Sequence, residues 1–171
     1  MFHAFDNAVS GQTNPRAEWM AVLARAPVAM LEQALHAHHT QRQIEWLRKP
    51  ETGLYMVQGR AGGTGERFNV GEVTVTRCAL RIVASEKQAS PVGVAYVLGR
   101  RQRHAELAAL ADALLQESAQ HDALQQSLLT PVRQHLALQS NLRQGQVQST
   151  KVDFFTVARE AGGSDDTEED A

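Results

Sequence analysis

The residues best suited to bind an anion form a short glycine-rich run: Gly62, Gly63, Thr64 and Gly65. Glycine tolerates positive φ angles, so neighbouring backbone N–H groups can converge into a nest that binds a phosphate or phosphonate oxygen. Arg60 and Arg67 flank the run and would add positive charge. The same run is typical of a turn between two strands, and the strong turn preference of glycine favours that interpretation.

The run does not match the phosphate-binding loops of common nucleotide-binding folds. No Gly-Lys-Ser/Thr follows it, as a Walker loop requires. The third glycine of the dinucleotide fingerprint is missing, and no helix is signalled after the run. We therefore expect a hairpin turn and not a nucleotide-binding fold, and we keep the run and Arg67 as candidates for contact with an anion or a partner.

A second basic cluster lies at the predicted start of a helix, between Arg100 and His104. Positive groups at a helix N-terminus oppose the helix dipole, which hints at an anionic ligand or partner. His104 and Glu106 match one half of the zinc deaminase signature, but the P-C-x-x-C half is missing. We expect a solvated helix start, with Arg100 and His104 available to an anion or a partner.

No set of residues predicts catalysis by this chain alone. Three histidines, at positions 36, 38 and 39, are too close in sequence to share one helical face as metal ligands. The single cysteine, Cys78, excludes an internal disulfide and a multi-cysteine metal site, and it fits a reducing cytoplasm. We expect no catalytic residue, metal or cofactor here, and we interpret Phe154 and Phe155 as anchors of a partner interface.

Length and composition predict one soluble domain with loosely attached ends. The 171 residues are 43% hydrophobic and 21% charged, ordinary values for a globular protein. No stretch approaches the roughly 20 apolar residues of a membrane span. We expect a flexible leader over residues 1–12, a single domain over 13–161 and a disordered acidic tail over 162–171. Without the five acidic residues of the tail, the formal charge rises from −2 to +3, which is too weakly basic to indicate nucleic acid.

The first part of the domain is predicted to be helical. Asn14 and Pro15 have the residue types of a helix N-cap and first helical position. Pro27 breaks this helix, and Val28 begins a second one that ends near His39.

The middle of the domain is predicted to form a sheet. The run 71–83 is the strongest strand, and its two faces are Val73, Val75 and Ala79 against Cys78, Leu80 and Ile82. Further strands are expected near 44–47, at 54–58 after a turn at 51–53, and at 92–98. Short loops between them favour an antiparallel meander of about four strands.

The chain is predicted to return to helices after Arg101. The spacing of Leu107, Leu110, Ala111 and Leu114 indicates one buried stripe. Two further helices are expected over about 119–128 and from Pro131, while the segment 151–159 leaves helix and strand open. Helices, then a sheet, then helices indicate the α+β class.

Three segments, taken in order, resemble one protein family. They are ETGLYMVQGRAGGTGERFNVGEVTVTRC at 51–78, GRRQRHAELAALADALLQ at 99–116 and KVDFFTVAR at 151–159, preceded by WMAVLARAP. In this order they look like the PhnG family of the phosphonate carbon–phosphorus lyase system over nearly the whole domain. The leader and the acidic tail lie outside the resemblance.

The resemblance implies a non-autonomous subunit that assembles with the H, I and J subunits of that system, with the I subunit as its main contact. Together with the H and I subunits and the ATPase-like L subunit, such a chain supports the displacement of adenine from ATP by an alkylphosphonate. This implies a structural or supportive role, without nucleic acid or membrane as a partner. The alternative from another class is an autonomous small nucleotide- or phosphonate-binding protein. A nucleic-acid-binding module using the basic run 100–104 is a further rival.

Overall fold

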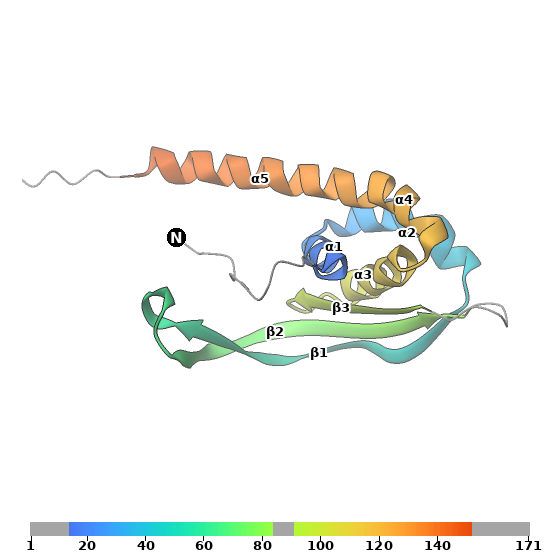
Figure 1. Cartoon of the computed structure of the whole chain (residues 1–171), viewed down its shortest axis with the longest axis horizontal. Helices are drawn as coiled ribbons and strands as arrows, with labels where there is room; N and C mark the ends of the chain where they lie inside the picture. Colours follow the sequence, from blue (N-terminus) through green and yellow to red (C-terminus); the bar gives the residue numbers. More distant parts are fainter. Residues whose placement is uncertain (1–13, 84–90, 152–171) are drawn as a thin grey trace, which may run out of the picture.

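The computed structural model describes residues 14–83 and 91–151 and has an α+β architecture. In chain order, the elements are α1 (Pro15–Leu23), α2 (Val28–Gln41), β1 (Ile44–Arg60), β2 (Arg67–Ile82), β3 (Val92–Leu98), α3 (Gln102–Leu115), α4 (Ser118–Leu124) and α5 (Thr130–Ser149). The helices lie on one side of the sheet (Figure 1). The expected leader, the acidic tail and the pair Phe154 and Phe155 lie outside the described residues.

The first helix begins where the sequence predicts it. The Asn14 side chain accepts a hydrogen bond from the backbone N–H of Arg16 at 3.1 Å, and Pro15 occupies the first helical position. This N-cap satisfies an N–H that has no partner inside the helix. Pro27 then precedes α2, so the predicted helix break is confirmed.

The sheet is an antiparallel meander in the order β1-β2-β3, with three strands where about four were expected. The predicted turn at 51–53 is wrong, because residues 44–60 form one strand. The pairing register shifts between Trp46 and Arg48 and again between Arg48 and Glu51, so β-bulges absorb the extra residues. Pro50 lies in the second shift, and β1 is an edge strand, where a missing N–H is tolerated.

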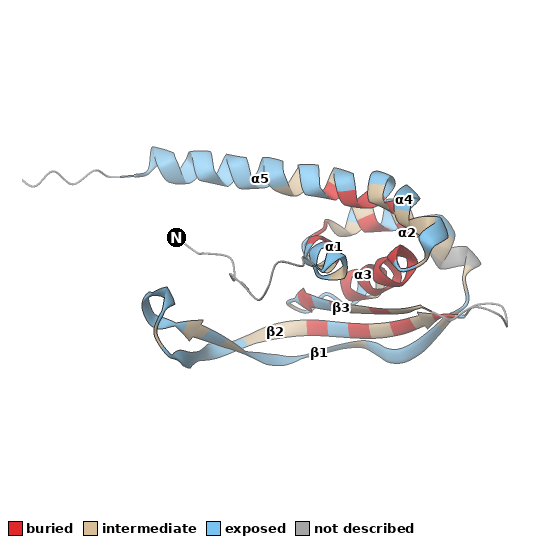
Figure 2. Ribbon diagram, viewed as in Figure 1, coloured by how far each residue is buried: buried red, intermediate tan, exposed pale blue. Residues whose placement is uncertain are grey.

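The core lies between the sheet and α3, at the end of the sheet where all three strands are present (Figure 2). Alternate residues of β2 point to the helices and are buried: Thr76, Cys78, Leu80 and Ile82. Their neighbours Val73, Val75 and Ala79 lie on the opposite face and are half-buried, which confirms the predicted division. In α3, every residue from 104 to 115 except Glu106 is buried, so this helix is covered on all sides.

The C-terminal helices form a nearly continuous rod. A five-residue π-helical turn, Gln125–Leu129, joins α4 to α5, and Pro131 lies at the start of α5. Val132 is buried, whereas the second half of α5 is exposed. In Figure 1, α5 and the β1–β2 hairpin both extend to the left, beyond the other helices. No described helix combines the length and the apolar character that crossing a membrane requires.

Candidate functional site

The glycine-rich run lies at the tip of the β1–β2 hairpin, which confirms that it forms a turn. A short 3₁₀ turn spans Ala61–Gly63, and Gly62 and Gly63 have φ angles of 60° and 81°. The Gly65 N–H donates to the Ala61 carbonyl at 3.0 Å, and Arg60 Nη1 donates to the Gly65 carbonyl at 3.2 Å. These bonds close the turn from within, and its anion-binding role stays a prediction.

The structure does not bring the two predicted basic clusters together. Arg67 pairs with Arg60 next to the tip, while Arg100 follows β3, whose last residue, Leu98, pairs with Val75. A strand rises about 3.3 Å per residue, so the tip lies about 26 Å along β2 from the end of β3. One small anion cannot contact both clusters within a single chain.

The expectation that His104 lies on a solvated helix start is wrong. Its side chain is 1% exposed, and its Nε2 lies 2.8 Å from the Leu23 carbonyl oxygen. A carbonyl only accepts, so Nε2 carries the proton and Nδ1 is unprotonated. Nδ1 has no hydrogen-bond partner among the described residues. His104 therefore joins α3 to the end of α1, and it does not face an anion in solution.

Burial keeps His104 neutral. Desolvation lowers the pKa of His104, the hydrogen bond to Leu23 opposes this shift, and the charge of Arg101 adds to it. In the unfolded chain the pKa returns to about 6.5. Between these two pKa values the unfolded chain binds a proton that the folded chain does not, so the folded state loses stability as the pH falls below about 6.5.

We expect the free energy of unfolding to decrease between pH 7 and pH 5, by at most about 1.4 kcal/mol per pH unit from this one group. Urea unfolding at several pH values measures this slope. In the His104→Gln variant the side chain no longer titrates, so its slope should be smaller than that of the wild type. Equal slopes would show that another group causes the acid sensitivity.

A buried carboxylate that the sequence analysis missed organises the core. Asp112 of α3 is fully buried and accepts hydrogen bonds from Arg16 Nη2 at 2.7 Å and from Trp19 Nε1 at 2.8 Å. It also accepts the backbone N–H of Val94 at 2.9 Å, and Arg16 Nη2 donates to the Val92 carbonyl at 3.1 Å. The carboxylate therefore joins α1, α3 and the outer edge of β3. These contacts give Asp112 a structural role.

A third buried polar group, Thr76, fixes the start of α3. Its hydroxyl donates to the Gly99 carbonyl at 2.6 Å and accepts the Arg101 N–H at 3.0 Å. Arg101 is the N-cap residue of α3, and its side chain makes no capping hydrogen bond. Thr76 thus performs the capping from a neighbouring strand.

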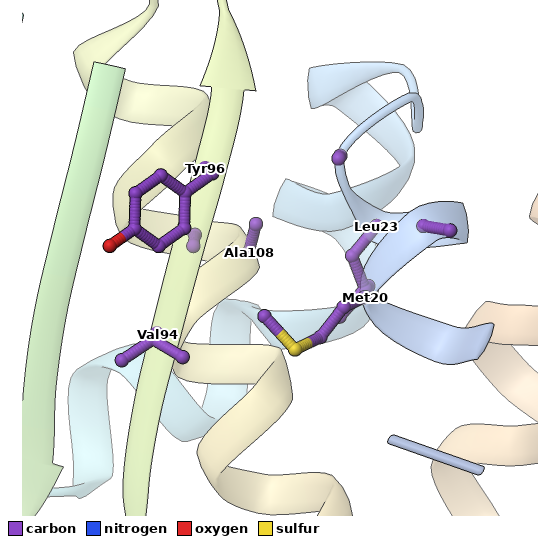
Figure 3. A pocket seen from close by; sticks show the side chains of 8 residues that line it. Met20, Leu23, Val94, Tyr96 and Ala108 are labelled. Carbon is purple, nitrogen blue, oxygen red and sulfur yellow. The ribbon is translucent and has the colours of Figure 1, made fainter. Parts of the chain in front are cut away.

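A small apolar pocket lies between α1 and β3, with α3 behind it (Figure 3). Met20 extends from α1 toward β3, where Val94 and Tyr96 line the other side. The cavity measures about 220 Å³. Because its lining is almost entirely apolar, it suits an apolar side chain better than a phosphate or phosphonate group.

The face of the sheet opposite the helices is apolar over half of its length. We call it the outer apolar face; its residues are Tyr55, Val57, Phe68, Val70, Val73, Val75, Tyr96 and Leu98. Beside it, on the same face, Glu51 accepts hydrogen bonds from Arg48 and Arg77, which lower its pKa. Glu45 and Arg81 form a further ion pair at 3.5 Å. Charged residues that pair with opposite charges thus border the apolar half.

Two features of the described residues bear on chemistry: the state of the Cys78 thiol and the grouping of possible metal ligands. Burial raises the pKa of Cys78 to about 11, so this thiol stays protonated and unreactive, as expected of a core cysteine. No group of three or more His, Cys, Asp or Glu side chains within residues 14–83 and 91–151 could hold a metal ion.

Comparison with known proteins identifies relatives over most of the chain. The family model described as phosphonate metabolism protein PhnG matches residues 14–160. A protein of Rhizobium meliloti (strain 1021), named alpha-D-ribose 1-methylphosphonate 5-triphosphate synthase subunit PhnG, is 40% identical over 144 residues. The match covers 84% of this chain and 88% of the relative.

Proposed function

Because the chain belongs to the PhnG family of phosphonate metabolism proteins, we propose that it is a non-autonomous subunit of the carbon–phosphorus lyase core complex. The complex transfers the ribose triphosphate moiety of ATP to an alkylphosphonate, in the cytoplasm. A phosphonate oxygen forms a bond to C1′ while the bond from C1′ to adenine breaks, and adenine leaves with a proton. The observation that carries this proposal is the 40% identity to a relative named as a synthase subunit.

We assign this chain a structural or supportive role in that reaction. Catalysis requires groups within hydrogen-bond reach of the reacting atoms. Two buried ionisable residues of this chain, Asp112 and His104, form hydrogen bonds inside the core instead. The reacting groups then come from neighbouring subunits. The I subunit is the proposed main contact, with the H and J subunits completing the assembly, and the hairpin tip with Arg67 contacts a partner or faces a shared site.

The alternative, an autonomous nucleotide- or phosphonate-binding protein, fits the structure less well. Such a protein needs polar or charged groups that converge on a pocket. The pocket between Met20 and Tyr96 is apolar, and the basic tip lies on an exposed turn at the far end of the hairpin. No observation favours this second function.

An assay of adenine release tests the proposal. The H, I and L subunits are incubated with ATP and methylphosphonate, with and without this chain, and the chain is also incubated alone. We expect omission of the chain to lower the rate at least about tenfold, which corresponds to about 1.4 kcal/mol of transition-state stabilisation. A mixture without methylphosphonate separates transfer from simple hydrolysis.

Two results would contradict the proposal. Adenine release by the chain alone would show that it is catalytic without partners. Full activity in the mixture that omits the chain would show that the reaction does not depend on it.

A further inference from the structure

The outer apolar face is an extended apolar surface that the described part of the chain leaves uncovered. We propose that this chain docks through this face on an apolar surface of a different subunit of its complex. The inference rests on the proposed function, since it needs a complex with other subunits. Beyond the proposed function, it specifies which side of the molecule the partner covers and what kind of surface the partner presents.

The outer apolar face is one continuous surface. Tyr55 pairs with Val73 and Leu98 pairs with Val75, which places all four side chains on the side opposite the helices. Near the tip, a Cβ on Gly59 would lie 2.8 Å from Val70 Cγ2 and 3.6 Å from Phe68 Cζ. Gly59, Val57 and Tyr55 are two residues apart along β1 and lie on the same face of the sheet. Phe68 and Val70, which lie next to Gly59, therefore belong to that face too.

This face is exposed to solvent in the single chain. Tyr55, Val70 and Leu98 expose 63%, 62% and 69% of their surface. The helices lie on the other side of the sheet, and Figure 2 shows the hairpin beyond the end of β3 as mostly exposed. Isolated apolar residues on a surface are ordinary, but a contiguous apolar patch with a polar border marks an interaction site.

The hairpin beyond β3 also lacks the support that a sheet normally gives. Past Val75 only β1 and β2 are paired, and an isolated two-stranded hairpin is marginally stable in water. On its inner face, Leu54 and Met56 expose 66% and 42% of their surface. Apolar residues on both faces are typical of a strand pair that is covered on both sides. A partner that packs against this segment would supply the missing layer.

The exposed area is sufficient for a stable contact. An ordinary interface buries about 800 Å² on each partner. The outer apolar face includes three aromatic residues, Tyr55, Phe68 and Tyr96, and an aromatic side chain buries about 150–250 Å² when it is fully covered. The five residues of the face with large exposed side chains, together with the half-exposed valines between them, reach this order of area. Tyrosine and phenylalanine are also enriched at interface centres.

The charges beside the face indicate an apolar partner and not a charged one. Glu51 lies between Arg48 and Arg77, and Glu45 pairs with Arg81, so these five side chains carry a net charge of only +1. Such pairs form a polar rim with only a weak net charge, so they do not select a strongly acidic or basic surface. The expected partner presents a broad apolar surface bordered by polar groups.

A second copy of this chain is a weaker candidate for the occupant. A two-fold contact through this face would consume it, and the complex would then need another apolar surface for its other subunits. Of the exposed apolar residues on α5, Leu138 and Leu142 lie on one side and Val147 lies on the opposite side, because each residue turns a helix by about 100°. They form no stripe of comparable extent.

Site-specific photo-crosslinking tests the proposal in the assembled complex. Val70 is replaced by p-benzoylphenylalanine in the full chain, which is co-expressed with the H, I and J subunits and irradiated. The matched control carries the same group at Leu142, which is also 62% exposed but lies on α5. We expect position 70 to crosslink to another subunit with a yield at least about tenfold higher than a surface outside the interface would give.

A substitution pair provides a second measurement. The variant Phe68→Glu/Val70→Glu should lower the amount of complex recovered by about tenfold or more, since charges would be buried in an apolar contact. Both side chains are exposed in the free chain, so the thermal midpoint of the variant alone should remain near that of the wild type. The variant Leu138→Glu/Leu142→Glu introduces the same charges on α5 and should assemble like the wild type.

The outcomes separate this inference from the proposed function. A wild-type chain that neither assembles with other subunits nor supports adenine release overturns the proposed function. A wild-type chain that assembles, with no crosslink from position 70 or a crosslink to a second copy alone, overturns the docking inference. Normal recovery of complex with the Phe68→Glu/Val70→Glu variant overturns it as well.

Discussion

Replacing Asp112 with alanine is expected to lower the free energy of unfolding by about 3 kcal/mol, the low end of the cost of breaking a buried ion pair, because the Arg16 side chain is 38% exposed and can be solvated. The carboxylate is fully buried and accepts hydrogen bonds from the side chains of Arg16 and Trp19 and from the backbone of Val94. Its loss leaves these donors without their acceptor. Because the donors belong to α1 and β3, one substitution on α3 loosens three elements together.

Urea unfolding followed by circular dichroism measures this loss. Asp122→Ala is the control, because Asp122 is an exposed aspartate on the neighbouring helix α4, and surface substitutions usually change stability by about 0.5 kcal/mol or less. The free energy of unfolding of Asp112→Asn should lie between the values for the wild type and Asp112→Ala. The amide oxygen of asparagine still accepts a hydrogen bond, but its NH₂ group faces the guanidinium. If Asp112→Ala unfolds at the same urea concentration as Asp122→Ala, the network does not stabilise the fold.

Replacing Gly93 with alanine is expected to lower the free energy of unfolding by about 3 kcal/mol or more, the upper end of the cost of overpacking. A Cβ at this position would lie 1.8 Å from the Ala109 carbonyl oxygen and 2.8 Å from the Ala113 backbone nitrogen. Both contacts are with the backbone of α3, which cannot rotate away as a side chain can. The helix would have to separate from β3 and lose the packing of the core.

The same substitution on α5 should have the opposite effect. Gly145 lies in the exposed half of α5, and a Cβ there meets no atom within 4 Å. Gly145→Ala should therefore stabilise the chain by about 0.5–1 kcal/mol, because alanine loses less backbone entropy in a helix. Thermal unfolding of the two variants and the wild type measures both the expected loss and the expected gain of stability. A Gly93→Ala variant as stable as Gly145→Ala would mean that β3 and α3 are not in close contact.

Local sequence patterns predicted the elements and faces of this fold well. The cap formed by Asn14 and Pro15 and the two faces of the strand 71–83 depend on residues that are neighbours in sequence. Their signals could be read without tertiary information. The same holds for the glycine-rich run 62–65, whose turn preference placed it between two strands.

The joining of two expected strands into β1 could not be predicted in this way. Residues 51–53 are common turn residues, and Pro50 is usually a breaker, so the local signal indicates a turn. Pairing with β2 overrides that signal, because bulges next to Arg48 absorb the additional residues and leave the strand continuous. Local propensity in strands depends strongly on such context.

The roles of Asp112 and His104 also depend on distant parts of the chain. Both lie on α3, and their hydrogen-bond partners Trp19 and Leu23 are on α1, 93 and 81 residues away. A helical pattern identifies an apolar stripe but not a helix that is buried on all sides. One signal was present: Asp112 is the single acidic residue between Leu107 and Gln116, and a carboxylate among apolar residues indicates a buried partner.

Pro50 and the two bulges in β1 have a consequence for a copy that has not yet met a partner. A long edge strand presents unpaired backbone groups on which the edge of another molecule can form a continuous intermolecular sheet. In β1 the register is irregular from Trp46 to Glu51 and regular from there to Val57. The irregular part cannot template a second strand, because bulges and a proline interrupt its hydrogen-bonding groups. On the β1 edge, residues 51–57 are therefore the regular stretch on which unassembled copies would pair edge to edge, and this stretch includes Tyr55 and Val57 of the proposed docking face.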